Sequence, residues 1–297
     1  MFQTIVKIFL LVIITAAITP FIRKLAFVLG AVDNPNARRI NKKPMPTIGG
    51  LAIFVAFNIG EFVLLRKDFP THELFSVLLA SSVIILTGLI DDILELKPRQ
   101  KMFGIFVASL VVYFLAGIKV RELSLPFLGH IQLGWWSFPL TIFWILALTN
   151  AVNLIDGLDG LATGVTLISL VTMGIVGFFF LKSWQHYVPI MCIMLAACLL
   201  GFLPYNFHPA KIFLGDTGAL YIGFMISVLS LKGLKNVTFV SLLVPILILG
   251  VPITDTVYAM IRRKLNKKNI SQADKHHLHH QLMRMGLTHR QTVLAIY

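Results

Sequence analysis

Long hydrophobic runs alternate with short polar segments along almost the whole chain. About 20 apolar residues in an α-helix cross the hydrocarbon core of a bilayer, which is roughly 30 Å thick. The runs predict membrane-spanning helices near residues 3–22, 47–65, 74–91, 102–118, 137–152, 161–181, 187–203, 214–231 and 238–261. A tenth apolar run starts at Thr292, close to the final Tyr297, so we expect the last span to be incomplete. The pattern predicts an all-α polytopic membrane protein, with about ten transmembrane helices in one domain over residues 1–297.

Composition supports a membrane protein over a soluble one. The chain is 57% hydrophobic and 13% charged, with a mean hydropathy of +0.84, whereas soluble domains carry about 25% charged residues. Basic residues follow the first run, at Arg23 and Lys24, which is the reverse of a signal peptide and indicates a retained span. Cys192 and Cys198 lie six apart within one apolar run. We expect them to be core residues, not a disulfide or a metal pair.

The basic residues predict the orientation of the bundle. With the N-terminus outside, the inner loops contain 18 of the 26 Lys and Arg residues, as expected because positive charge accumulates on the cytoplasmic side. The net charge of +13 suits anionic lipid headgroups and an anionic substrate, not nucleic acid. Eight of the nine aspartates also fall on the inner side. Carboxylates at membrane depth are costly and usually face a cavity, a metal or a charged partner, so we expect a functional site there.

GLIDD places Asp91 and Asp92 at the end of the third predicted span. The pair could be two solvated residues at a helix end, or it could bind a divalent cation or act as a general base.

NLIDGLDG spaces Asn153, Asp156 and Asp159 three residues apart. On a helix this spacing would place them on one face. A packing face of small residues would explain the glycines of this motif but not its carboxylates. An EF-hand is excluded because its acidic residues would have to lie two apart.

The segment NFHPAKIFLGDTG contains Asn206, His208, Lys211 and Asp216. Asp216 could simply cap a helix, but beside other carboxylates it also suits a Mg²⁺ ligand that contacts a diphosphate.

Two further segments are rich in cationic or metal-binding side chains. In DKHHLHH, His276 and His280 have the spacing of many zinc ligands on helices, or the histidines could donate hydrogen bonds to phosphate. In RRINKKP, the basic residues are either membrane anchors or phosphate contacts.

Together these segments predict chemistry on an activated phosphate at the inner face. Carboxylates with a hard cation are how proteins usually bind diphosphates, and phosphoryl transfer requires mainly positioning and charge neutralisation. No Walker A loop, kinase signature or G-x-S-x-G elbow is present. The substrate itself must therefore supply the energy. A cation transporter is the alternative of another class, but an ion path should pass through the bilayer midplane, whereas these carboxylates cluster at one face.

The ordered motifs KPMPTIGG, GLIDD, NLIDGLDGLATG, NFHPAKIFLGDTG and HLHH resemble the polyprenyl-phosphate N-acetylhexosamine-1-phosphate transferases over nearly the whole chain. The resemblance implies transfer of a sugar 1-phosphate from a UDP-sugar to a membrane polyprenyl phosphate, with release of UMP and with Mg²⁺, or alternatively Mn²⁺, as cofactor. The HLHH motif is more similar to the N-acetylglucosaminyl type than to the muramoyl-pentapeptide type, which stays the alternative. UDP-N-acetylglucosamine and undecaprenyl phosphate are therefore the implied partners, in a bacterial plasma membrane.

The resemblance also implies roles for individual residues. It places the acidic catalytic pair on Asp91 and Asp92 and the Mg²⁺ ligand on Asp216, to which we add Asn153 or Asp156 as helping ligands. The implied substrate-binding residues are Lys42 (with Lys43 as an alternative), Asn153, Asp156, Asp159, Asn206, His277, His279 and His280. We expect the product to start a surface glycan such as teichoic acid or lipopolysaccharide. Whether the chain forms a homodimer is left open.

Overall fold

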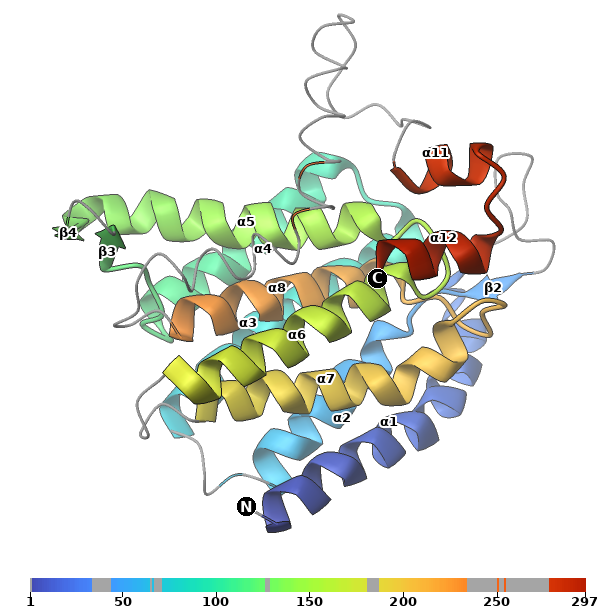
Figure 1. Ribbon diagram of the computed structural model, residues 1–297, viewed down its shortest axis with the longest axis horizontal. Coiled ribbons are helices and arrows are strands. Elements are labelled where there is room, and N and C mark those ends of the chain that lie inside the picture. The colour runs from blue at the N-terminus through green and yellow to red at the C-terminus, as the bar shows by residue number, and fades with distance from the viewer. Residues whose placement is uncertain are drawn as a thin grey trace, which may run out of the picture.

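The structure is a computed structural model that describes residues 2–33, 44–64, 66, 71–125, 129–180, 187–233, 250, 254 and 278–297. Its longer helices are α1 (Phe2–Leu29), α2 (Gly50–Ile59, continued by a π-helical turn over Gly60–Leu64), α3 (Thr71–Leu94), α4 (Pro98–Phe114), α5 (Ser137–Ile155), α6 (Leu161–Phe180), α7 (Tyr187–Asn206) and α8 (Gly215–Gly233). These eight helices lie side by side in one bundle (Figure 1). Two shorter helices near the C-terminus, α11 (Leu278–Arg284) and α12 (His289–Ile296), lie at one end of it.

Five of the described helical segments are long and apolar enough to cross a membrane: Gln3–Leu29, Thr71–Leu94, Gly134–Ile155, Leu161–Phe179 and Tyr187–Asn206. The prediction of a helical membrane protein is therefore confirmed, while the count of ten spans and the orientation stay predictions. The ninth predicted span, 238–261, lies outside the described residues. The first helix is longer than its predicted span, because it continues from residue 22 to Leu29.

Two short antiparallel pairs of strands lie at opposite ends of the bundle (Figure 1). Strand β3 (Glu122–Leu125) pairs with β4 (Gly129–Gln132) in a hairpin between α4 and α5. Strand β1 (Val32–Asp33) pairs with β2 (Met45–Pro46), so that Val32 lies opposite Pro46 and Asp33 opposite Met45. The second pair lies at the end of the bundle where α12 lies (Figure 1).

Helix α8 lies at the centre of the bundle and packs against α2, α3, α5, α6 and α7. Its residues from Ala219 to Ile222 and from Phe224 to Ile226 are at most 1% exposed, as expected for a helix that is surrounded on all sides. The outer helices instead direct large apolar side chains away from the protein, among them Phe9, Phe21 and Phe143. Lipid tails are as apolar as these side chains, so a membrane would accommodate them without cost. Cys192 and Cys198 are buried and unbonded to each other, as predicted.

Glycines let two neighbouring helices approach the first turn of α8 closely. A Cβ atom added at Gly50 of α2 would overlap the backbone of Gly218, and one added at Gly88 of α3 would overlap the backbone of Thr217. The close approach at Gly88 places the last turn of α3 directly beside the N-terminus of α8. Asp91 and Asp92, the two acidic residues of GLIDD, therefore lie close to Asp216.

Backbone hydrogen bonds join the KPMPTIGG segment to the chain just before α8. The amide of Phe213 donates to the carbonyl of Pro46 (2.8 Å), and the amides of Gly49 and Gly50 donate to the carbonyls of Phe213 and Leu214 (3.1 and 3.0 Å). Gly215 follows with φ +71°, and a Cβ there would overlap the carbonyl oxygen of Thr47. This turn therefore requires glycine.

Candidate active site

A cavity of about 540 Å³ opens at the end of the bundle where these segments meet. Of its seventeen lining residues, seven are acidic and one, Lys101, is basic. The acidic residues are Asp33, Asp91, Asp92, Glu95, Asp156, Asp159 and Asp216. Four of the predicted motifs thus contribute to one cavity, although they are up to about 170 residues apart in the sequence.

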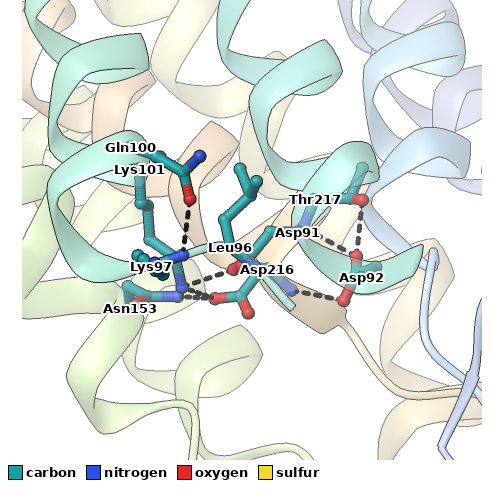
Figure 2. Close-up of polar contacts among 9 residues, drawn as sticks. All are labelled: Asp91, Asp92, Leu96, Lys97, Gln100, Lys101, Asn153, Asp216 and Thr217. Atoms are coloured by element: carbon teal, nitrogen blue, oxygen red, sulfur yellow. Dashed lines mark hydrogen bonds and ion pairs between the residues drawn. The ribbon is translucent and has the colours of Figure 1, made fainter. Parts of the chain in front are cut away.

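Asp92 caps the N-terminus of α8 from the end of α3 (Figure 2). Its Oδ1 accepts a hydrogen bond from the backbone amide of Asp216 (3.0 Å), and its Oδ2 accepts from the amide and the hydroxyl of Thr217 (2.9 and 2.6 Å). The first amides of a helix have no partner within the helix, and a carboxylate there also interacts favourably with the helix dipole. Asp92 therefore fixes the position of Asp216.

Lys101, in the first turn of α4, bridges the two carboxylates Asp91 and Asp216 (Figure 2). Its Nζ lies 2.5 Å from Oδ2 of Asp91 and 2.9 Å from Oδ1 of Asp216. Burial favours the neutral amine, but the two carboxylates outweigh this effect and raise the pKa of Lys101 above its ordinary value. The lysine is therefore a fixed positive charge in an acidic cavity.

Lys101 was missed as a site residue by sequence reasoning, which counted it only among the inner positive charges. A signal was available: only residues 95–97 separate α3 from α4. A basic residue in the first turn of α4 therefore has to lie near the acidic residues in the last turn of α3.

Two further groups fix the carboxylates of the α3–α8 junction. Asn153, in the last turn of α5, donates from Nδ2 to the same Oδ1 of Asp216 that Lys101 contacts. Asp91 is 6% exposed, and its Oδ1 accepts from the amide of Leu96 (2.7 Å). Predicted site residues from three separate motifs therefore meet, because Asn153 contacts Asp216 directly and Lys101 joins Asp216 to Asp91.

Asp156 faces other carboxylates and is not paired with a cation in the part of the chain that the structure describes. Burial raises the pKa of Asp156 well above its usual range, and the negative charges of Asp216, Asp92 and Asp159 raise it further. A divalent cation would relieve this repulsion, because carboxylate and amide oxygens are the ligands that hard cations prefer. The residues present therefore fit a Mg²⁺ ion, with Asp216, Asp156 and Asn153 as the groups that would hold it.

The prediction that Asn153, Asp156 and Asp159 line one helix face is wrong. Helix α5 ends at Ile155, Asp156 is its C-cap with φ −74° and ψ 57°, and residues 156–160 form a turn before α6. Gly160 completes this turn with φ +80°, a conformation that favours glycine. The three side chains nevertheless line the same cavity, because the turn wraps around its wall.

Asp159 and Asn206 are both tied to the loop that follows α7. Oδ2 of Asp159 lies 2.9 Å from Nδ1 of His208 and accepts from the amide of Ala210 (3.2 Å). Asn206 is 3% exposed; its Oδ1 accepts from the hydroxyl of Thr163 (2.7 Å), and its Nδ2 donates to the carbonyl of Ile212 (3.2 Å). Asn206 thus fixes the loop in addition to lining the cavity.

Some of the predicted residues cannot be placed in the cavity. Lys42, Lys43 and His277 lie outside the described residues. His279 and His280 fall within α11, but their side chains are not among those described. Their roles stay predictions.

Comparison with known proteins identifies relatives of the chain. The model of the family described as glycosyl transferase family 4 matches residues 74–234. A Bacillus subtilis (strain 168) protein named as a probable undecaprenyl-phosphate N-acetylglucosaminyl 1-phosphate transferase is 45% identical over 94% of this chain and 77% of its own length. A decaprenyl-phosphate N-acetylglucosaminephosphotransferase of Mycolicibacterium smegmatis is 34% identical over 96% and 76%, respectively. A phospho-N-acetylmuramoyl-pentapeptide-transferase of Clostridium botulinum is 33% identical over 87% and 81%.

Proposed function

The chain belongs to glycosyl transferase family 4, and we propose that it transfers N-acetylglucosamine 1-phosphate from UDP-N-acetylglucosamine to undecaprenyl phosphate, releasing UMP. The observation that carries this proposal is the acidic cavity with its single described lysine at the end of a bundle of apolar helices. A lipid phosphate held in a bilayer and a water-soluble nucleotide sugar can both reach such a place. The similarity to the Bacillus subtilis transferase supports the same donor and acceptor.

The reaction exchanges one phosphoanhydride bond for another. An oxygen of the lipid phosphate attacks the β-phosphorus of the UDP-sugar, a new phosphorus–oxygen bond forms, and the bond from that phosphorus to the bridging oxygen breaks. UMP leaves with the bridging oxygen. Such a transfer requires alignment and charge neutralisation more than covalent help from the protein.

Asp216, Asp156 and Asn153 would hold the Mg²⁺ ion, which when bound neutralises charge on the diphosphate. Asp92 contributes indirectly, because its hydrogen bonds to residues 216 and 217 set the position of the first turn of α8. Lys101 offers a fixed positive charge to a phosphate oxygen while it neutralises Asp91 and Asp216. Preorganised charges of this kind cost no reorganisation during the reaction.

Asp91 is the better candidate than Asp92 for orienting or deprotonating the lipid phosphate. Both oxygens of Asp92 accept hydrogen bonds from α8, whereas Oδ2 of Asp91 accepts none among the described residues and lies beside Nζ of Lys101. A double displacement through an aspartyl phosphate is the alternative route. A burst of UMP from enzyme and UDP-sugar without lipid acceptor would favour the double displacement, and absence of both a burst and a trapped phosphoenzyme would contradict it.

A second candidate function is the transfer of phospho-N-acetylmuramoyl-pentapeptide, which the similarity to the Clostridium botulinum protein supports. One assay separates the two functions. Purified protein is incubated with Mg²⁺, undecaprenyl phosphate and either UDP-N-acetylglucosamine or UDP-N-acetylmuramoyl-pentapeptide, and UMP release is measured. We expect release with the first donor only. Release with the second donor alone would establish the second function, and no release with any UDP-sugar would contradict both.

The matched control for this assay compares two acidic residues at opposite ends of the bundle. Asp216→Ala should abolish UMP release, since it removes the carboxylate at the centre of the cavity. Glu122→Gln, at an exposed position on the β3–β4 hairpin, should leave release unchanged. In cells, we expect the protein in the bacterial plasma membrane, where its product would start teichoic acid or another surface glycan.

A further inference from the structure

Three potential metal ligands from distant parts of the chain meet beside the cavity. Asp159 lies in the turn before α6, His208 in the loop after α7, and His289 at the start of α12. One ligand atom from each residue lies within 4.8 Å of the other two. The arrangement differs from the Asp216 region, because it offers two imidazole nitrogens in addition to a carboxylate.

At least one potential ligand atom in this group of three residues has no hydrogen-bond partner. The two imidazole rings stack, with centroids 4.2 Å apart and planes inclined by 18°. Nε2 of His289 is buried and has no hydrogen-bond partner among the described residues. A buried ring nitrogen without a partner is costly, and a metal ion bound to it would remove that cost.

The spacing is close to what a tetrahedral ion requires. Two ligands bound to the same zinc ion at 2.0–2.1 Å lie about 3.4 Å from each other. Nδ1 of His208 and Oδ2 of Asp159 are already 2.9 Å apart. A small outward shift of this pair and a rotation of the His289 ring out of its stack on His208 would complete the coordination, because a bound ion lies in the plane of each imidazole ring.

We propose that Asp159, His208 and His289 form a transition-metal site, best suited to Zn²⁺, that fastens α12 to the loop after α7 and to the turn before α6. Two imidazoles with one carboxylate favour zinc and related ions over Mg²⁺, which prefers oxygen ligands alone. Three protein ligands leave a fourth position for water or a substrate oxygen, and Asp159 also lines the cavity.

Other contacts of α12 reach the same two segments. Nε of Arg290 donates to the carbonyl of His208 (3.1 Å), and the hydroxyl of Tyr297 donates to the carbonyl of Gly160 (2.6 Å). Thr292 and Val293 are fully buried. A metal ion at the first residue of α12 would therefore strengthen a docking contact that the helix already makes along its length.

Hydrogen exchange on the full chain in lipid nanodiscs tests the proposal locally. Zn²⁺ added at 100 times its Kd should slow exchange at residues 289–296 and 207–210 by up to about 100-fold, because it binds only the docked form. His289→Gln and His208→Phe should each lose this protection. His72→Gln, at an exposed histidine near the N-terminus of α3, should retain it. Local exchange is the right measurement because other histidines of the chain could also bind zinc.

A second measurement uses only the unmodified protein, so it does not depend on whether the histidine variants fold. Co²⁺ added to the unmodified protein should produce the visible absorption of a tetrahedral site, and Zn²⁺ should remove that absorption. The proposal is overturned if zinc slows exchange at neither segment, or if His289→Gln and His208→Phe both keep the full protection. Neither readout depends on transferase activity, so a failure here would leave the proposed function standing.

Discussion

Asp92 holds the first turn of α8 through Thr217, whose backbone amide and hydroxyl both donate to Oδ2 of the aspartate, at 2.9 and 2.6 Å. The contact joins the end of one helix to the start of another that lies more than 120 residues away in sequence. Two adjacent carboxylates therefore have different surroundings, because Asp92 caps the N-terminus of α8 while Asp91 pairs with Lys101.

Replacing Asp92 with Asn should reduce stability as well as turnover. The amide can accept only part of the three hydrogen bonds, and loss of a helix cap costs about 1–2 kcal/mol. We expect a lower melting temperature and faster hydrogen exchange at residues 215–219. Asp91→Asn, which leaves the cap intact, should reduce UMP release without that change in exchange. Equal exchange in the two variants would contradict a capping role for Asp92.

Replacing Lys101 with Met should lower kcat by at least about 100-fold, the usual effect of losing one preorganised charge contact. The variant leaves Asp91 and Asp216 without their shared cation, so their repulsion should also weaken the binding of phosphate. Lys101→Arg keeps the charge and should retain part of the activity. UMP release measured at saturating UDP-sugar checks this, and near-normal kcat in the Met variant would exclude a role for the lysine in the reaction.

Removing the metal should stop the reaction reversibly. Excess EDTA should abolish UMP release, and added Mg²⁺ or Mn²⁺ should restore it, because both ions accept oxygen ligands. Asp156→Asn should raise the Mg²⁺ concentration required for half-maximal activity by about tenfold, as expected for a weakened ligand set.

Asp159→Asn is the control for the metal experiment. The hydrogen bonds of Asp159 go to His208 and to the amide of Ala210, not to Asp216. The Asp159→Asn variant should therefore change the KM for the UDP-sugar more than the Mg²⁺ requirement. The opposite result, a shifted Mg²⁺ requirement in Asp159→Asn alone, would move the proposed ion to the other wall of the cavity.

Replacing Gly88 with Ala should separate α3 from α8. The added Cβ would overlap the backbone of Thr217, and overpacking a core typically costs about 1–3 kcal/mol. We expect reduced thermal stability and loss of UMP release, since Asp92 would move away from α8. Leu86→Ala, at a position 57% exposed on the same helix, should have little effect on either measurement. A stable, active Gly88→Ala variant would show that the helices can separate without harm to the site.

Sequence alone was sufficient for the class of protein and for five of the seven acidic residues that line the cavity. Helix-length apolar runs identify membrane spans because a bilayer imposes its own thickness, and carboxylates such as Asp91, Asp156 and Asp216 are conspicuous because they are costly in that setting. The ordered motifs also indicated the family.

Only the tertiary structure decided what each of these side chains contacts. Periodicity extended a helix through Asp159, but α5 ends at Ile155 because the chain has to turn around the cavity wall. Lys101 resembled any other inner positive charge until the short α3–α4 connection placed it between two carboxylates. His208 and His289 are 81 residues apart in the sequence and become neighbours only when α12 docks. Local sequence shows which polar side chains are costly in a membrane and therefore stand out. The residues that they contact are determined by long-range packing, here by glycines that let helices meet around α8.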